Sequence, residues 1–328
     1  MNHLSLILLI LLSVDRQPVQ ERTAGRVLEP EAIASQHLGG NRTIQVYLPP
    51  SYHRNPQQRY PVLYVHDGQN VFSTAGPDVA FGWGSWEIDL TIDRMVDEGK
   101  MREIIVVAVA NTRQRMQEYR GPARPWSEEE LSRMQRQPAA PGDNSRYESY
   151  RRFLVEELKP WIDQSYRTLT EPAHTGLLGS SLGGICSLAL AWDRPDVFGL
   201  AASLSGSFQI EQSYFLEEML KPYQDHPKSI RIYLDSGSIS LGGGNDGATL
   251  TAAVADELRR IGWQEDHNLH NFLDAEPLSP AELEPLQLSD QKCAEAQRSQ
   301  HNELYWRLRV WRPLIFLFPV EPPPLSTY

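Results

Sequence analysis

Short apolar runs alternate along this chain with segments of helical periodicity. Pro61–His66 (PVLYVH) and Glu103–Ala110 (EIIVVAVA) are almost continuously apolar, which is typical of parallel strands buried on both faces. Thr43–Leu48 alternates in polarity and is also expected to be a strand. Four further strands are predicted, at His174–Leu178, Leu200–Leu204, Ile230–Asp235 and Asn268–Leu273. This order predicts an α/β fold with a mostly parallel central sheet and helices on both of its faces.

Helices are expected between these strands. Ser85 begins one that runs to Glu98 and stops at Gly99, and Ser145 with Glu148 forms a capping box for another toward Tyr166. The remaining predicted helices are Leu182–Trp192, Glu211–Leu220, Thr249–Ile261 and Tyr305–Phe318, the last interrupted at Pro313.

Two stretches, Thr112–Asn144 and Ala275–Ser299, break this rhythm with polar residues and prolines. Loops of this length in a compact domain are usually functional or disordered. We therefore expect both to wall a substrate pocket. Arg113, Glu118 and Tyr119 in the first stretch are candidate substrate contacts, and a structural salt-bridge role is an equal alternative.

Charge and cysteine content exclude several classes of protein. The 328 residues carry a formal net charge of −11, whereas a nucleic-acid-binding protein would show a basic surface. The two cysteines, Cys186 and Cys293, cannot form a disulfide scaffold or a four-thiolate metal site. No HExxH or Cys-x-x-Cys motif is present, so we expect no metal and no organic cofactor.

An apolar run covers Leu4–Val14 near the N-terminus. It is too short to span a bilayer as a helix but suits the core of a signal peptide. We predict a signal peptide or flexible N-terminus over 1–25, a single α/β domain over 26–320 and a tail over 321–328. Export to the periplasm or medium is the favoured location, and the cytoplasm is the alternative.

The strongest local motif is Gly179-Ser180-Ser181-Leu182-Gly183. It matches G-x-S-x-G, in which a serine occupies a strained turn between a strand and a helix. The predicted strand before it and the small residues after it fit that context. Ser181 is the predicted nucleophile, exposed above a helix N-terminus that favours developing negative charge.

A second segment, His66–Asn70, directly follows a predicted strand. An elbow serine needs an oxyanion hole made by the backbone N–H after the nucleophile and another from such a loop. We predict that Leu182 and either Gly68 or Gln69 supply these donors.

The general base must be one of nine histidines. On this scaffold the residues follow the order serine, acid, histidine. The histidines that remain under this rule are His226, His267, His270 and His301. His301 is favoured because it follows the last strand and opens the last helix.

Several segments together resemble the esterase branch of the α/β-hydrolase superfamily. That branch includes siderophore esterases, feruloyl and acetyl-xylan esterase domains, S-formylglutathione hydrolases and mycolyltransferases. The matching segments are 43–52, 60–72, 111–119, 153–168, 176–188, 231–238 and 301–318. The resemblance implies an α/β-hydrolase fold with Ser181 as nucleophile and His301 as base. The chain departs from the pattern at Ala275–Ser299, where relatives have a short turn.

The acid has three candidates, Asp235, Asp246 and Asp274. Related esterases carry their acid in a loop after a Gly-Ser/Thr pair that resembles Gly237-Ser238, so Asp246 is favoured, Asp235 is second and Asp274 third. The expected function is hydrolysis of a small-molecule carboxylic ester through an acyl-enzyme. Acyl transfer to a sugar or lipid is the alternative, followed by a non-catalytic binding module. The oligomeric state is not predicted.

Overall fold

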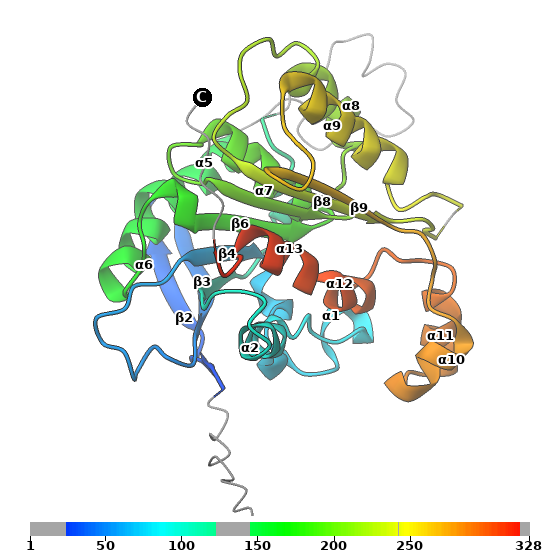
Figure 1. Cartoon of the computed structure of the whole chain (residues 1–328), viewed down its shortest axis with the longest axis horizontal. Helices are drawn as coiled ribbons and strands as arrows, with labels where there is room; N and C mark the ends of the chain where they lie inside the picture. Colours follow the sequence, from blue (N-terminus) through cyan, green and yellow to red (C-terminus); the bar gives the residue numbers. More distant parts are fainter. Residues whose placement is uncertain (1–23, 123–144, 242, 322–328) are drawn as a thin grey trace, which may run out of the picture.

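The computed structural model describes residues 24–122, 145–241 and 243–321. The apolar run at 4–14, most of the first polar stretch and all but the first residue of the predicted tail lie outside these ranges. The described residues contain a nine-stranded sheet with the order β1-β3-β5-β4-β6-β7-β8-β9, and β2 pairs with β3 (Figure 1). Its strands are β1 Arg26–Val27, β2 Glu31–Ser35, β3 Gly40–Leu48, β4 Val62–His66, β5 Ile105–Val109, β6 Thr175–Ser180, β7 Leu200–Leu204, β8 Arg231–Gly237 and β9 Leu269–Asp274. Strands β4 to β9 run parallel, which confirms the predicted fold class.

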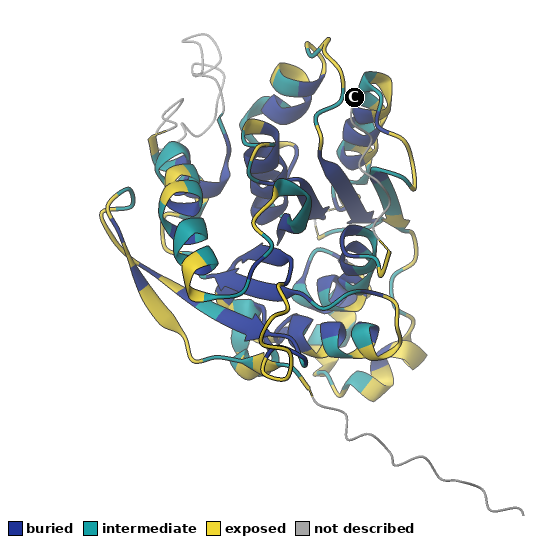
Figure 2. Cartoon of the chain, turned by 60° about the vertical axis from the view of Figure 1, so that its left-hand side comes forward, coloured by how far each residue is buried: buried dark blue, intermediate teal, exposed yellow. Residues whose placement is uncertain are grey.

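Helices cover both faces of the sheet (Figure 1). They are α1 Val79–Gly82, α2 Ile88–Asp97, α3 Arg115–Tyr119, α5 Ser145–Arg152, α6 Lys159–Ser165, α7 Leu182–Asp193, α8 Ile210–Tyr214, α9 Ala248–Ile261, α10 Pro280–Leu283, α11 Asp290–Ala296, α12 Glu303–Arg309 and α13 Trp311–Leu317. One apolar core lies between the sheet and α5, α6, α7 and α9, and a second between the sheet and α2, α12 and α13. The inner strands are therefore buried along their length, as Figure 2 shows in dark blue.

The register of the parallel strands brings four turns to one edge of the sheet. Val65 pairs with Leu178, Ser180 pairs with Leu204, and Leu204 pairs with Asp235. The carboxyl ends of β4, β6, β7 and β8 consequently lie side by side, which is where α/β sheets place their ligand sites.

The N-terminal part of the chain differs from the prediction in two strands and in the start of one helix. Strands β1 and β2 were not predicted; they form antiparallel pairs with β3 at the edge of the sheet. The helix expected from Ser85 begins instead at Ile88, because Glu87 has a left-handed backbone with φ of 52°. Its predicted end is confirmed, since Gly99 has φ of 66° and donates its N–H to the carbonyl of Val96.

The helix predicted from Ser145 is present as α5, and the Glu148 carboxylate accepts hydrogen bonds from Arg151. A π-helical segment, Phe153–Leu158, connects α5 to α6. The tyrosines and leucines of this region are buried in the core between the helices and the sheet: Tyr147, Tyr150, Leu154 and Leu158.

The C-terminal region requires two corrections. The break in the last helix lies at Val310, between α12 and α13, and Pro313 lies within the first turn of α13. The segment Ala275–Ser299 is not an irregular loop, because it contains α10, a 3₁₀ turn at Glu284–Leu286 and α11. Its apolar side chains form a small third core with Trp83, Leu304 and Tyr305.

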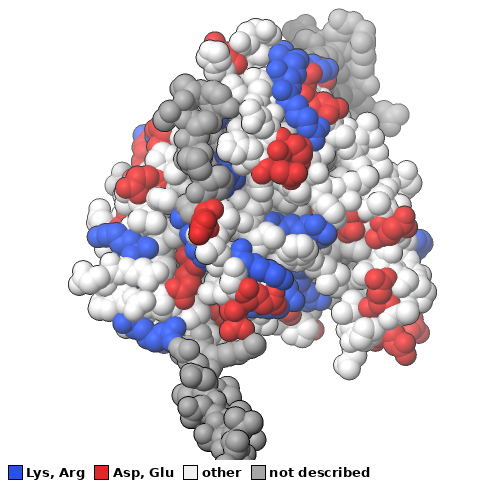
Figure 3. All heavy atoms as spheres, viewed as in Figure 1, with Lys and Arg blue, Asp and Glu red and all other residues white. Residues whose placement is uncertain are grey.

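The outer surface mixes charges of both signs. Figure 3 shows acidic and basic side chains interspersed across the viewed face. Among the described residues, no helix has the length and apolar character needed to cross a membrane.

Candidate active site

The strand-to-helix turn at Ser181 has the strained geometry expected of a nucleophile elbow. Ser181 has φ of 54° and ψ of −121° at the N-terminus of α7. A Cβ atom built on Gly179 would lie 2.5 Å from the carbonyl carbon of Gly183. This contact explains why the motif needs glycine at the position two residues before the serine. The backbone strain holds the Ser181 side chain in a fixed place.

Ser181, His301 and Asp246 form a continuous hydrogen-bonded series. The Ser181 Oγ lies 3.0 Å from His301 Nε2, and His301 Nδ1 lies 2.6 Å from Asp246 Oδ1. Because a carboxylate only accepts, Nδ1 carries a proton and Nε2 is free to accept the hydroxyl proton. The imidazole is 35% exposed and the aspartate side chain 0%, so the site is open on the serine side and closed on the acid side.

The other two acid candidates are held elsewhere. Asp235 Oδ1 lies 3.2 Å from the Arg309 guanidinium, and Asp274 Oδ2 lies 3.2 Å from the same group. Burial raises the pKa of Asp235 to about 6, although Arg309 opposes this shift. Of the three aspartates, the structure therefore brings Asp246 to His301.

The loop after β4 packs directly against the elbow. Asp67 has φ of 57°, and a Cβ on Gly68 would lie 2.5 Å from the carbonyl carbon of Ala108. On the other side, a Cβ on Gly183 would lie 3.1 Å from His66 Cβ and 3.3 Å from Asp67 Oδ2. The loop is thus clamped between β5 and the start of α7, next to the two predicted sources of oxyanion donors.

An ion pair fixes this loop. Arg115 donates to both oxygens of Asp67, at 2.6 and 2.7 Å, and the Asn111 side chain donates to Oδ1 at 2.5 Å. The Gln69 side chain accepts the Asn111 N–H at 3.1 Å. Leu182 is the first residue of α7. The assignment of the oxyanion donors to the backbone of Leu182 and of Gly68 or Gln69 stays a prediction.

The three candidate substrate contacts fall in different environments. Arg113 is exposed. Glu118 is 2% exposed and accepts two hydrogen bonds from Arg42, at 2.7 and 3.0 Å, and this geometry favours its alternative role in a structural salt bridge. Tyr119 is 0% exposed, and its hydroxyl accepts the Asp67 N–H at 3.4 Å. Glu118 and Tyr119 therefore support the loop from behind rather than facing a substrate.

A cavity of about 300 Å³ opens beside the acid and the base. The described residues that line it are mostly small and polar, and among them only Asp246 and His301 are ionisable. The lining residues are Ser205, Gly206, Ser207, Gln209, Ser240, Leu241, Asp246, Gly247, Ser299 and His301.

Two ionisable groups near the site have shifted titration. Burial lowers the pKa of His66 to about 4, and its Nδ1 lies 2.9 Å from the Tyr150 hydroxyl. Burial also raises the pKa of Glu303 to about 6, with a further increase from Asp67. His66 is therefore a neutral, buried support for the elbow at neutral pH.

Sequence reasoning did not identify three residues that complete the site. Ser207 Oγ lies 3.1 Å from Ser181 Oγ, and Ser205 donates to Asp246 Oδ2 at 2.6 Å. Arg309 donates to Ser205 at 2.8 Å. The available signal was the position of Ser205 and Ser207 directly after a strand that neighbours the nucleophile strand.

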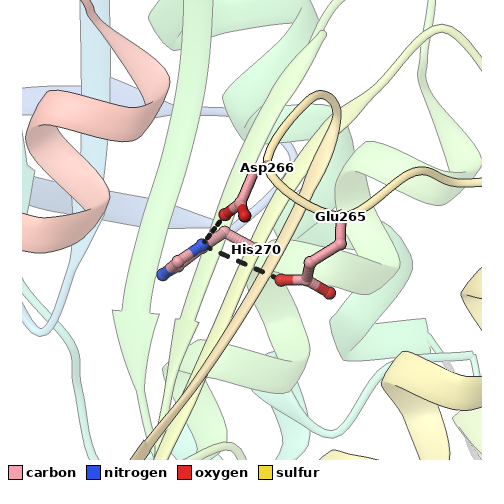
Figure 4. A group of neighbouring side chains, drawn as sticks. All are labelled: Glu265, Asp266 and His270. Carbon is pink, nitrogen blue, oxygen red and sulfur yellow. Dashed lines mark hydrogen bonds and ion pairs between the residues drawn. The ribbon is translucent and has the colours of Figure 1, made fainter.

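Glu265, Asp266 and His270 form the group best suited to a metal ion among the described residues (Figure 4). Their oxygens are already used. Glu265 accepts from Arg259 at 2.6 Å and from the Asn271 N–H at 2.8 Å, and Asp266 lies 2.8 Å from His270 Nδ1. The group covers backbone of β9 at the edge of the sheet, which is a common way to protect an edge strand.

Several known proteins are similar to this chain in sequence or in structure. A family model described as "Putative esterase" matches residues 35–273. The uncharacterized protein YbbA of Bacillus subtilis (strain 168) is 26% identical over 204 residues, which cover 62% of this chain and 71% of that protein. A ferulic acid esterase structure aligns with a TM-score of 0.61 at 17% identity, over 91% of this chain and 100% of that one. The enterobactin esterase FES from Shigella flexneri aligns with a TM-score of 0.58 at 16% identity, over 90% of this chain and 59% of that one.

Proposed function

Because this chain belongs to the Putative esterase family, we propose that it is a serine hydrolase that cleaves small-molecule carboxylic esters through Ser181, His301 and Asp246. The observation that carries this proposal is the hydrogen-bonded series from the elbow serine to the buried carboxylate, with separations of 3.0 and 2.6 Å. Both distances lie within the range for proton transfer and orientation.

In the proposed reaction, Ser181 Oγ attacks the ester carbonyl as His301 Nε2 takes its proton. Asp246 holds the imidazole by Nδ1 and stabilises the imidazolium that forms. The protonated base then gives the proton to the departing alcohol, which leaves an acyl-enzyme on Ser181. Water then attacks the acyl-enzyme as His301 takes its proton, and His301 returns that proton to Ser181 as the carboxylic acid is released.

The oxyanion of each tetrahedral intermediate needs backbone donors. We assign these to the N–H of Leu182 and to the N–H of Gly68 or Gln69. The assignment is supported by the close packing of the loop after β4 against the first turn of α7. His66 and Asp67 of that loop approach Gly183 of the helix so closely that a Cβ on Gly183 would lie 3.1 and 3.3 Å from them. No metal or organic cofactor is needed for this chemistry.

The site itself leaves the acyl and alcohol parts of the ester open. The name of one aligned structure, a ferulic acid esterase, suggests feruloyl esters for the first trials. A useful panel contains short p-nitrophenyl esters, feruloyl and acetylated sugars, and catechol siderophores. Assays with and without an acceptor alcohol distinguish hydrolysis from the alternative of acyl transfer.

The test of the proposal is Ser181→Ala, with the adjacent Ser180→Ala as a matched control. Ser181→Ala should lower kcat by about 10⁶-fold and abolish labelling by a fluorophosphonate probe. Ser180 precedes the elbow at the end of β6, so its loss should leave labelling intact. Ester hydrolysis or labelling that survives in Ser181→Ala would contradict the proposal, and wild-type protein that is never labelled would favour a non-catalytic binding module.

Export is proposed on the apolar run Leu4–Val14 alone, which lies outside the described residues. Mass spectrometry of the N-terminus of native protein tests it. A mature chain that starts near residue 25 is expected, and an intact Met1 on cytoplasmic protein would contradict it.

A further inference from the structure

We propose that Ser205 is a positioning residue for Asp246, and that Trp306 and Arg309 direct its only proton onto that carboxylate. This inference rests on the proposed function, because it assigns Ser205 a role relative to the pair of Asp246 and His301. Ser205 follows β7 directly and is 1% exposed.

The direction of the Ser205 hydroxyl follows from a count of donors and acceptors. A serine hydroxyl has one proton and two lone pairs. Trp306 Nε1–H donates to it at 3.1 Å, and the Arg309 guanidinium donates to it at 2.8 Å. Neither of these groups can accept a hydrogen bond. The proton of Ser205 is therefore left for Asp246 Oδ2, which lies 2.6 Å away.

The two oxygens of Asp246 consequently have separate partners. Oδ2 accepts the Ser205 hydroxyl and also the Gly237 N–H at 2.6 Å. Oδ1 is left for His301 Nδ1 at 2.6 Å. Two donors on one oxygen prevent rotation of the carboxylate, so Oδ1 stays aimed at the imidazole. Trp306 contributes twice, because its ring also packs edge-on against His301 at 5.1 Å between centroids.

The cation behind Ser205 is itself held in place. Arg309 is 3% exposed and lies 3.2 Å from both Asp235 and Asp274. Asp235 and Asp274, which do not reach His301, thus hold the Arg309 guanidinium in place against Ser205. Through this neutral hydroxyl, the charge of Arg309 supports the negative charge of Asp246.

This arrangement predicts how the rate should depend on pH. The Ser205 donor draws negative charge away from Oδ1. Without this donor, the Asp246 carboxylate binds the protonated imidazole of His301 more tightly. The imidazole then stays protonated, and so inactive as a base, up to a higher pH. The acid limb of the kcat/KM profile should then move to higher pH. The freed carboxylate should also lower the plateau by losing its orientation.

The test compares Ser205→Ala with Ser203→Ala on a short p-nitrophenyl ester. Ser203 lies two residues earlier in β7, is 0% exposed, and its Oγ has no hydrogen-bond partner among the described residues, so it controls for loss of a buried hydroxyl. We expect Ser205→Ala to lower kcat roughly 10- to 100-fold with KM little changed, and to shift the acid limb to higher pH. Ser203→Ala should match the wild type in both.

Additional variants separate the possible failures. Ser205→Cys keeps the volume and a weak donor, so it should give an intermediate rate, and it replaces the alanine variant if that variant does not fold. A reduced kcat with an unmoved acid limb would indicate a merely structural role and overturn the inference. If Asp246→Asn is inactive while Ser205→Ala equals the wild type, the positioning role alone fails. If Asp246→Asn keeps full activity, Asp246 is not the catalytic acid and the positioning role of Ser205 fails with that assignment, whereas loss of the proposed function itself would appear as activity that survives in Ser181→Ala.

Discussion

At the scale of single residues, the arrangement of three aspartates around one arginine explains how one carboxylate is selected. Asp235 is 0% exposed and already engaged by Arg309, by the Ser205 N–H and by the Tyr233 hydroxyl. Asp246 instead takes its donors on one oxygen and offers the other to His301. The aspartate that pairs with His301 is therefore the one with a carboxylate oxygen that other donors leave free, and its sequence separation from His301 does not decide the pairing.

Asparagine substitutions test this selection. Asp246→Asn should lower kcat by about 10⁴-fold with folding preserved, because the amide supports the wrong imidazole tautomer. Asp235→Asn should instead cost about 3 kcal/mol of unfolding free energy, since it leaves the buried Arg309 with one carboxylate fewer, and should retain most of kcat. Steady-state kinetics and urea unfolding of both variants measure the difference. The acid assignment would move to Asp235 if Asp246→Asn stayed near wild type while Asp235→Asn lost its activity.

At the scale of elements, the sequence predicts a strand where a continuous run of apolar residues requires burial on both faces of the sheet. β7 lies at the predicted residues, and β4 and β5 differ only at their ends, because continuous apolar runs have one stable environment in a parallel sheet. β1 and β2 could not be predicted, since they are short edge strands that depend on pairing with β3.

The residues of the candidate site also divide into those that the sequence predicts and those that it does not. The position of Ser181 follows from a local motif, and that of His301 from strand order. Ser205 and Arg309 match no motif, because their roles arise only when the ends of β7, β8 and α12 are brought together. Long-range contacts of this kind leave no spacing pattern in the sequence.

The β4 loop yields a prediction on steric grounds. Gly68→Ala would place a Cβ 2.5 Å from backbone of β5, so the loop must shift. We expect a loss of about 1–3 kcal/mol in unfolding free energy and a reduced kcat, because the proposed oxyanion donor moves with the loop. Gly40→Ala in β3 is the control, since nothing lies within 4 Å of its added methyl group. Wild-type stability and kcat in Gly68→Ala would show that the loop tolerates displacement.

One tyrosine hydroxyl contacts both ends of the helical insertion at 275–299. Tyr305 donates its proton to the Ala296 carbonyl at 2.7 Å and accepts the Leu278 N–H at 2.8 Å. Tyr305→Phe should cost about 1–3 kcal/mol of unfolding free energy, because the buried Ala296 carbonyl and the partly buried Leu278 N–H lose their partner. It should also speed proteolysis between α10 and α11. If the insertion walls the pocket, activity on bulky esters should change more than activity on a p-nitrophenyl ester, whereas an equal loss on all esters would indicate a purely structural segment.

At the scale of the whole molecule, the sheet separates two apolar cores and gathers buried ionisable groups at its carboxyl edge. His66 and Asp235 both belong to this edge, at the ends of β4 and β8. Burial lowers the pKa of His66 to about 4 and raises the pKa of Asp235 to about 6. Both shifts mean that folding favours the uncharged form. Their effects on stability oppose each other with pH, since His66 disfavours folding in acid and Asp235 disfavours it as pH rises from about 4 to 6.

The contribution of His66 can be isolated with His66→Asn, in which the amide can still reach the Tyr150 hydroxyl and no longer titrates. Below the ordinary histidine pKa of 6.5, the unfolded chain binds a proton that the folded protein excludes until about pH 4. Wild-type stability is therefore complete above pH 6.5 and falls as the pH decreases through this window. Between pH 7.5 and pH 5, the wild type should lose about 2 kcal/mol more than His66→Asn in urea unfolding. Asp235→Asn should change the same difference with the opposite sign, because the carboxyl it removes takes up a proton near pH 6 in the folded protein but only near pH 4 in the unfolded chain. Equal pH dependence in the wild type and His66→Asn would mean that His66 accepts a proton in the folded protein, and that the support beneath the elbow is open to water.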